Sequence, residues 1–181
     1  MQQAPENERL EVLFSPETIA VRLEELAGEI AAQRLEPLLV VAVLKGSFVF
    51  AADLIRALNR TGMQPEVDFI TLSSYRKSRV SSGTVDILRD VELDVAGRNV
   101  LLVDDVLDSG RTLAFAKDLM SARDARSIRT CVLLNKNTPR AVDIGADFFA
   151  FECPPIFVVG YGMDVGHRFR ELPFVGRIVG E

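Results

Sequence analysis

Three acidic side chains within one short stretch, Asp104, Asp105 and Asp108, are placed where they could do chemistry together. The first two directly follow the apolar run of residues 100–103, and the third comes after one further apolar pair. Carboxylates of this kind bind sugar hydroxyls or a hydrated Mg²⁺, an ion that is held by few carboxylates and keeps several of its waters. The stretch therefore predicts a site for hydroxyl groups and magnesium.

A loop of small residues, Ser109-Gly110-Arg111-Thr112, follows these acids and leads into an apolar pattern at helical spacing. Such a loop offers bare backbone N–H groups and the positive end of a helix dipole, which together suit a phosphate. Asp-Asp and Asp-Ser-Gly are also ordinary turn residues. Turn chemistry explains any two of these features, but it explains poorly why all of them occur within fifteen residues.

A parallel sheet is the element that would position this loop. Residues 100–103 are four apolar residues in a row, which is typical of a strand covered on both faces, and ligands of open parallel sheets bind beyond the carboxyl ends of the strands. A second unit has the same order: the Val-rich run 38–44, the loop Lys45-Gly46-Ser47, and a helix over 48–58. Alone, Lys-Gly-Ser would be only a turn; beside the acidic loop it places a cation near the expected phosphate.

The other elements fit an α/β fold with right-handed crossovers. Ser15-Pro16-Glu17 is a helix start, with a capping hydroxyl and a proline in the first turn. Residues 1–10 are expected to be loosely attached. The patterns further predict strands over 65–72, 127–134, 148–151 and 175–179 and a helix over 112–122.

Composition excludes several classes of protein. The chain has 181 residues, enough for one domain with a real core, and its net charge of −5 argues against a general nucleic-acid surface. Neither a signal peptide nor a membrane-spanning run is visible, and Cys131 and Cys153 read as buried free thiols, so a cytoplasmic location is expected. The single histidine, His167, excludes a zinc site of several histidines; it is expected to be exposed.

The polar segment of residues 73–90 is longer than a compact connection needs. It can be interpreted as a solvated hairpin or as a mobile lid over a site.

The acidic loop resembles the phosphoribosyl pyrophosphate motif of the type I phosphoribosyltransferases. That motif is a hydrophobic strand, two acids, two apolar residues, Asp, Ser or Thr, Gly, a variable residue and Thr. Two further segments, Lys136-Asn-Thr-Pro-Arg140 and Phe157-Val-Val-Gly-Tyr-Gly-Met-Asp164, resemble base-binding segments of the hypoxanthine and hypoxanthine-guanine branch. The resemblance covers most of residues 38–175.

This resemblance implies the type I phosphoribosyltransferase fold, a mainly parallel sheet with flanking helices and a small hood over the carboxyl ends of the strands. The chain would be a single domain over 1–181, with a core at about 36–140, a flexible loop at about 74–90, and a hood from about 141 to 181 together with the N-terminal segment. Family members often have a cis peptide before the lysine that corresponds to Lys45.

The implied activity belongs to purine salvage. The 5-phosphoribosyl group would pass from phosphoribosyl pyrophosphate to N9 of a 6-oxopurine, hypoxanthine or guanine, giving IMP or GMP and pyrophosphate. Mg²⁺ would be the cofactor, and no nucleic acid or membrane would take part. The resemblance also suggests a homodimer or homotetramer.

The resemblance assigns a role to each candidate residue. Lys136 would donate to the purine O6, Phe157 would stack on the base, and the Val158 backbone would meet its edge. Asp108 would be the catalytic acceptor at N7. Ser74 and Tyr75 would belong to the closing loop. The remaining residues would bind phosphoribosyl pyrophosphate and metal: Lys45 and Gly46 at the pyrophosphate, Asp104 and Asp105 at the ribose and Mg²⁺, Ser109, Gly110, Arg111 and Thr112 at the 5′-phosphate, Arg170 at pyrophosphate, and Asp164 at or near Mg²⁺ and the base.

Some positions depart from the family pattern. Relatives often have Glu at Asp104 and Gly at Ser47, some have Lys at Ile156, and a Tyr-containing run is common where residues 165–167 stand here. The last two lie beside the base pocket, so the choice among hypoxanthine, guanine and xanthine stays open.

Two other readings use the same features. One is an RNA-binding pyrimidine-operon regulator on the same fold, and the other is a receiver-type signalling domain. The purine-type segment at 157–164 and the acidic net charge disfavour the regulator. A receiver domain needs its acids after the first strand, whereas Asp104 and Asp105 lie past mid-chain.

Overall fold

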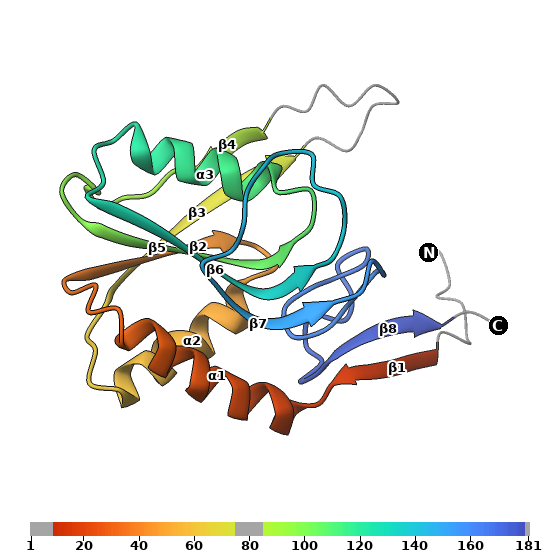
Figure 1. Ribbon diagram of the computed structural model, residues 1–181. Coiled ribbons are helices and arrows are strands. Elements are labelled where there is room, and N and C mark those ends of the chain that lie inside the picture. The colour runs from red at the N-terminus through yellow and green to blue at the C-terminus, as the bar shows by residue number, and fades with distance from the viewer. Residues whose placement is uncertain (1–8, 75–84, 180–181) are drawn as a thin grey trace.

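The computed structural model describes residues 9–74 and 85–179, and its centre is a six-stranded sheet with the order β4-β3-β2-β5-β6-β7. Every neighbouring pair in this sheet is parallel except β3 and β4. Helices α1 and α2 cover one face and α3 covers the other (Figure 1). This is the α/β architecture that the sequence predicts. The elements are β1 (Arg9–Phe14), α1 (Pro16–Ala31), β2 (Leu38–Leu44), α2 (Phe48–Arg60), β3 (Glu66–Ser74), β4 (Val85–Arg89), β5 (Asn99–Leu107), α3 (Arg111–Ser121), β6 (Ser127–Lys136), β7 (Phe148–Cys153) and β8 (Val175–Val179).

The two central strands, β2 and β5, are buried on both faces, which explains their unbroken apolar sequences. Alternate residues belong to different cores. Val40 and Leu101 pack with the buried side chains of α1 and α2, whereas Leu39 and Leu102 pack with Leu113 and its neighbours on α3. Burial on both sides fixes the register of these strands and therefore the positions of the residues at their ends.

Side-chain hydrogen bonds fix the starts of the first two helices. The Ser15 hydroxyl accepts from the Thr18 N–H at 3.2 Å and caps α1, with Pro16 as the first helical residue. Before α2, the buried Ser47 hydroxyl donates to the Val43 carbonyl at 2.5 Å and ties the loop back onto its own strand. The loop at Lys45 and Gly46 is therefore held close to the end of β2.

The carboxyl ends of β2, β5 and β6 meet at one edge of the sheet. The register places Ala42 beside Val103, and Leu107 beside Asn135 on the next strand. The residues that follow these pairs are the Lys45 loop, the acidic loop and Lys136. Three segments far apart in the sequence thus come together.

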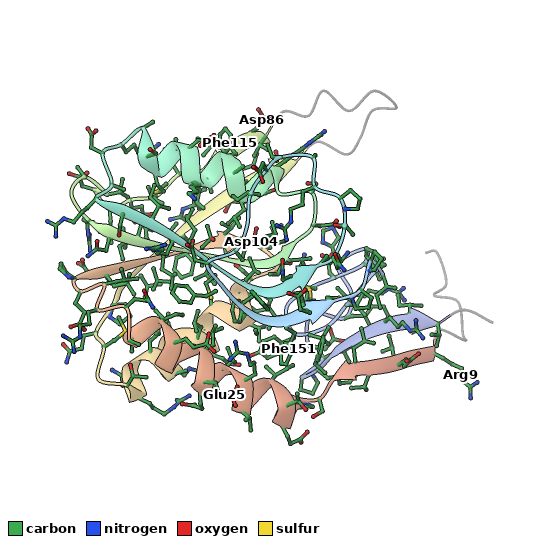
Figure 2. All side chains as sticks on the ribbon, viewed as in Figure 1. Arg9, Glu25, Asp86, Asp104, Phe115 and Phe151 are labelled. Atoms are coloured by element: carbon green, nitrogen blue, oxygen red, sulfur yellow. The ribbon has the colours of Figure 1, made fainter. Side chains whose placement is uncertain are left out.

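A second, two-stranded sheet pairs β1 with β8 antiparallel beside the main sheet (Figure 1). We define the hood as β1 together with residues 154–179. Phe14 of β1 stacks on Phe151 of β7, which is labelled in Figure 2, with ring centroids 4.2 Å apart. This stacked pair, which also contributes to the core on the α1 side, joins the hood to the main sheet.

The structure refines three expectations. Residues 9 and 10, which were expected to be loose, belong to strand β1, because this strand pairs with β8 near the other end of the chain. The hood is expected from about 141; within that range, β7 pairs with β6 in the main sheet, which is why the hood is defined here from residue 154. The strand over 85–89 was implied only by the hairpin alternative for residues 73–90, since only Val85 of β4 is buried and the apolar signal is weak.

Most of the expected closing loop lies outside the described residues. Tyr75 and the residues up to 84 belong to this part, and Ser74 is described only as the backbone end of β3. The remainder of the segment, β4, pairs antiparallel with β3, as in the hairpin alternative. The flexible loop expected at about 74–90 stays a prediction.

Cys131 and Cys153 are buried free thiols, as the sequence predicts. Across residues 9–74 and 85–179, no helix has both the length and the apolar character that a membrane crossing requires.

Truncating a central core residue should destabilise the protein far more than truncating an exposed one. Leu101 of β5 is fully buried, so Leu101→Ala should lower the free energy of unfolding by about 2–5 kcal/mol through lost burial and a residual cavity. Leu88 of β4 is 66% exposed, so Leu88→Ala should change it by less than about 0.5 kcal/mol. Urea denaturation of both variants gives the comparison. Equal losses would contradict the burial of β5 on both faces.

Candidate active site

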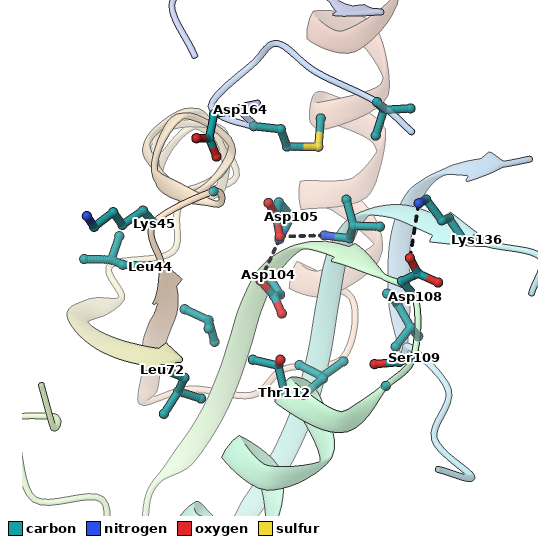
Figure 3. Close-up of a pocket in the computed structure, with 18 of the residues that line it drawn as sticks. Leu44, Lys45, Leu72, Asp104, Asp105, Asp108, Ser109, Thr112, Lys136 and Asp164 are labelled. Carbon is teal, nitrogen blue, oxygen red and sulfur yellow. Dashed lines mark hydrogen bonds and ion pairs between the residues drawn. The ribbon is translucent and has the colours of Figure 1, made fainter. Parts of the chain in front are cut away.

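A cavity of about 320 Å³ lies at the carboxyl edge of the sheet, between the strand ends and the hood. Figure 3 shows the side chains around it. Three loops after strands and one hood loop supply the walls. From the predicted set, the cavity is lined by Lys45, Gly46, Asp104, Asp105, Asp108, Ser109, Gly110, Thr112, Lys136, Phe157, Val158 and Asp164.

Asp104 and Asp105 form the acidic floor of this cavity. The Asp105 N–H donates to the Asp104 carboxylate, and the Val106 N–H donates to the Asp105 carboxylate, both at 2.9 Å. Burial raises the pKa of Asp104 well above its usual range, and the neighbouring Asp105 charge raises it further. Burial also raises the pKa of Asp105. A site with two such carboxylates favours a ligand that brings positive charge or hydrogen-bond donors.

Gly46 lies against this acidic pair. A Cβ at this position would be 1.8 Å from the Asp105 Oδ2, so only glycine lets the loop come this close to the carboxylate. The peptide between Leu44 and Lys45 is cis. The Lys45 side chain is exposed and extends away from the acidic pair (Figure 3). The loop therefore presents its backbone to the carboxylates and its ammonium group to the cavity rim.

Asp108 and Lys136 form the far end of the cavity. The Lys136 Nζ lies 3.2 Å from the Asp108 Oδ2, and the Thr138 hydroxyl donates to the Asp108 Oδ1 at 3.3 Å. Lys136 is largely buried, whereas half of the Asp108 side chain is exposed. This end thus offers a hydrogen-bond donor and an acceptor side by side.

Phe157 gives this end a flat apolar wall. It is 55% exposed although it is a large aromatic residue, and it lines the cavity next to the buried Val158. An exposed aromatic ring at a cavity wall suits stacking against a planar ligand.

The loop before α3 has the geometry of an anion site. Gly110 has a φ of 80°, and a Cβ there would lie 2.5 Å from the Ile144 Cγ2, so both backbone conformation and space require glycine. Gly110 is also the N-cap of α3 and supplies no side-chain acceptor, which leaves N–H groups of the first turn available. Arg111 is exposed and is not among the residues that line the cavity.

Arg170 lies beside the cavity rather than in its wall. Its guanidinium donates to the Gly162 carbonyl at 2.7 Å and pairs with the Asp164 Oδ1 at 2.8 Å. The other Asp164 oxygen accepts from the His167 N–H at 2.8 Å, and the His167 side chain is exposed as predicted. Arg170 was expected at pyrophosphate; in the structure its described partners hold the hood loop around Asp164.

The acidic floor suits magnesium, an ion that does not need a closed cage of protein ligands. In the described part of the chain, no three His, Cys, Asp or Glu side chains are grouped so that they could hold a metal, and Asp164 does not join Asp104 and Asp105 in such a group. Magnesium commonly takes one or two carboxylates, several waters and substrate phosphates. The raised pKa values of the pair show carboxylates that a cation would stabilise as anions.

The sequence did not single out several residues that shape the site. Leu72, Val106, Leu107, Leu113 and Met163 complete the cavity wall. Thr138 lies within the segment 136–140, but nothing in the order of residues indicated its bond to Asp108. That contact depends on the path of the chain after β6.

Comparison with known proteins agrees with this geometry. The family model described as the phosphoribosyl transferase domain matches residues 13–165. Hypoxanthine-guanine phosphoribosyltransferase from Aquifex aeolicus is 44% identical over 169 residues, which is 92% of this chain and 93% of that protein. Hypoxanthine phosphoribosyltransferase from Buchnera aphidicola is 38% identical over 94% of this chain and 96% of its own. A crystal structure of a hypoxanthine-guanine phosphoribosyltransferase from Bacillus anthracis superposes with a TM-score of 0.86 at 39% identity, covering 96% of this chain and all of that one.

Removing the Asp104 charge should stabilise the metal-free protein at neutral pH. Because folding raises the pKa of Asp104, the folded protein binds the proton more tightly than the unfolded chain. Stability is therefore lost as the pH rises from the ordinary carboxyl value through the folded one, and the loss is largest above both. Asp104→Asn should raise Tm at pH 7, by about 2–4 °C for each kcal/mol regained.

Thermal unfolding with a chelator present measures this effect. The advantage of Asp104→Asn should shrink at about pH 4, where the unfolded carboxyl begins to protonate. The control is Asp118→Asn, a change at an exposed position of α3. A gain in Tm that is the same at both pH values would contradict the burial penalty.

Proposed function

The chain belongs to the phosphoribosyltransferase family, and we propose that it is an enzyme of purine salvage. It transfers the 5-phosphoribosyl group from phosphoribosyl pyrophosphate to N9 of a 6-oxopurine, hypoxanthine or guanine, and forms IMP or GMP and pyrophosphate. The family match over residues 13–165 and the relatives that bear these names support this activity.

The observation that carries the choice of base is the pair at the far end of the cavity. On a 6-oxopurine, O6 and N7 are neighbours on one edge, and the reactive form with a proton at N7 offers an acceptor beside a donor. The Lys136 Nζ and the Asp108 Oδ2, 3.2 Å apart, form the complementary donor and acceptor. A purine with a 6-amino group would turn a donor towards the ammonium, so adenine should be rejected.

Asp108 is the group that we expect to take the proton from N7 as N9 forms its bond to the ribose. Phe157 stacks on the base and keeps its plane fixed while Lys136 binds O6. The Val158 backbone and the neighbourhood of Asp164 meet the opposite edge of the base. All three 6-oxopurines present the same O6 and N7 edge, so a preference among hypoxanthine, guanine and xanthine must come from this second contact.

The other end of the cavity serves the sugar phosphate. The N–H groups at Ser109–Thr112 bind the 5′-phosphate, and Asp104 and Asp105 bind the ribose hydroxyls. As the bond to pyrophosphate breaks, positive charge develops on the sugar and negative charge on the leaving group. The carboxylates of the acidic floor stabilise the positive charge on the sugar. The positive charges of Lys45 and Arg170 neutralise the negative charge on the pyrophosphate.

Mg²⁺ is the cofactor that we propose for Asp104 and Asp105. When bound, it would neutralise charge on the pyrophosphate. The buried Asp104 and the half-buried Asp105, both with raised pKa values, support this assignment.

Self-association into a homodimer or homotetramer is also part of the proposal. It is supported by large apolar side chains that remain exposed on α1, α2 and β3, namely Val21, Phe48 and Phe69.

The activity is tested by incubating the protein with phosphoribosyl pyrophosphate, Mg²⁺ and hypoxanthine, guanine, xanthine, adenine or orotate in turn. Nucleotide formation, followed by chromatography, should occur with 6-oxopurines and depend on Mg²⁺, with little use of adenine. Turnover of adenine or orotate equal to that of hypoxanthine and guanine would refute the assignment of the base.

Asp108→Asn should impair chemistry more than binding. The amide keeps the size of the side chain and can hydrogen-bond, but it cannot accept the proton from N7. General-base catalysis typically contributes about 100- to 10,000-fold, so kcat should fall by roughly that factor. The affinity for nucleotide should change much less.

Single-turnover rates of Asp108→Asn and of the exposed control Asp118→Asn give the measurement. The control should keep wild-type rates. A near wild-type rate in Asp108→Asn would move the proton acceptor to another group.

A further inference from the structure

Arg140 makes a bridge that the proposed mechanism does not use. It lies in the segment of residues 137–147, here called the strap, which runs from the end of β6 towards β7. We propose that Arg140 is a positioning residue that fixes the base end of the cavity relative to its 5′-phosphate end. This inference rests on the proposed function.

The guanidinium of Arg140 joins the end of β6 to the far part of the strap. Its Nη2 donates to the Asn135 Oδ1 at 2.6 Å, and its Nη1 donates to the Ile144 carbonyl at 2.5 Å. Asn135 directly precedes Lys136, the proposed O6 donor, and its amide also donates to Glu152 of β7 at 2.9 Å. One side of the bridge is thus anchored on the sheet, next to the base-binding lysine.

The other side of the bridge lies on the phosphate loop. The Ile144 side chain fills the space in front of Gly110, where a Cβ would come within 2.5 Å of it. The Ala141 N–H donates to the Ser109 carbonyl at 3.0 Å, and Thr138 reaches Asp108 at 3.3 Å. The strap therefore contacts the phosphate loop at two points and the proposed proton acceptor at a third.

The chemistry of this bridge requires arginine. Two acceptors on opposite sides of the strap need a planar group with several donors in fixed directions, which guanidinium has and ammonium lacks. The Nε of Arg140 is buried and has no hydrogen-bond partner among residues 9–74 and 85–179, a cost that the two hydrogen bonds of the same guanidinium must offset. The two hydrogen bonds thus fix the position of Asn135 relative to Ile144.

A ligand that touches both ends of the cavity should depend on this geometry, and a ligand that touches one end should not. A purine nucleoside monophosphate places its base at Lys136 and its phosphate at residues 109–112 simultaneously. Mutations that alter the coupling between two sites typically change it by about 0.5–2 kcal/mol, which corresponds to about 2- to 30-fold in affinity. Ribose 5-phosphate and the free nucleoside each occupy one end of the cavity, so a change in the distance between the two ends should not affect their binding.

The test compares Arg140→Lys with wild type by calorimetric titration of GMP and IMP, of ribose 5-phosphate, and of guanosine and inosine. The nucleotide affinity should fall by up to about 30-fold. The affinities for the sugar phosphate and the nucleosides should stay within about twofold, the range of ordinary surface changes. Asn135→Ala, which removes one acceptor of the bridge, should reproduce this selective loss in weaker form and serves if Arg140→Lys does not fold.

Arg22→Lys is the matched control. Arg22 also donates to two backbone carbonyls, those of Ala150 and Phe149, at 2.8 and 2.9 Å, but it lies on α1 away from the cavity. It should lower Tm without changing the ratio of nucleotide to sugar phosphate affinity.

Equal losses for the nucleotide and its fragments would overturn the proposal, since Arg140 would then shape only one end of the site. Unchanged nucleotide affinity in both bridge variants would also overturn it. A wild-type protein that forms no nucleotide would instead refute the proposed function.

Discussion

Two neighbouring carboxylates, those of Asp104 and Asp105, are held at the buried end of the central strand, and the rest of the structure is arranged around the cost of keeping them there. Burial opposes their ionisation, so the fold must supply compensating stability. It does so by covering β2 and β5 on both faces. The same pair excludes any side chain at Gly46 and sets how closely the neighbouring loop can approach.

The walls of the cavity come from three separate parts of the structure. The sheet edge supplies carboxylates, the loop before α3 supplies backbone donors, and the hood supplies an aromatic wall. Each part is held to its neighbour by specific contacts. The strap joins the base end to the phosphate loop, and the Tyr161 hydroxyl donates to Asp53 of α2 at 2.5 Å, which joins the hood to the helix that follows the Lys45 loop. The relative positions of the three parts depend on these contacts between them more than on any one part alone.

The parts of the site that lie within one continuous stretch were predictable. Asp104 to Thr112 contains strand end, acids, small residues and helix start in order, so local chemistry indicated its role. The parts that depend on register between distant segments were not predictable. The 3.2 Å contact of Lys136 with Asp108 follows from the pairing of β5 with β6, and the pairing of Arg170 with Asp164 follows from the path of the hood loop. For the same reason β1, whose partner is near the other end of the chain, carried no local signal.

The pairing of β1 with β8 has a consequence for synthesis of the chain on the ribosome. Strand β1 emerges early, but the residues that complete its sheet, Val175–Val179, emerge after all of the parallel core. Pairings between distant segments form late because their loop-closure entropy must be overcome first. A growing chain therefore passes through a stage in which the sheet edge and phosphate loop can form while the base-binding wall is still open. The hood, which carries the Phe157 wall of the cavity, is completed only when β8 pairs with β1.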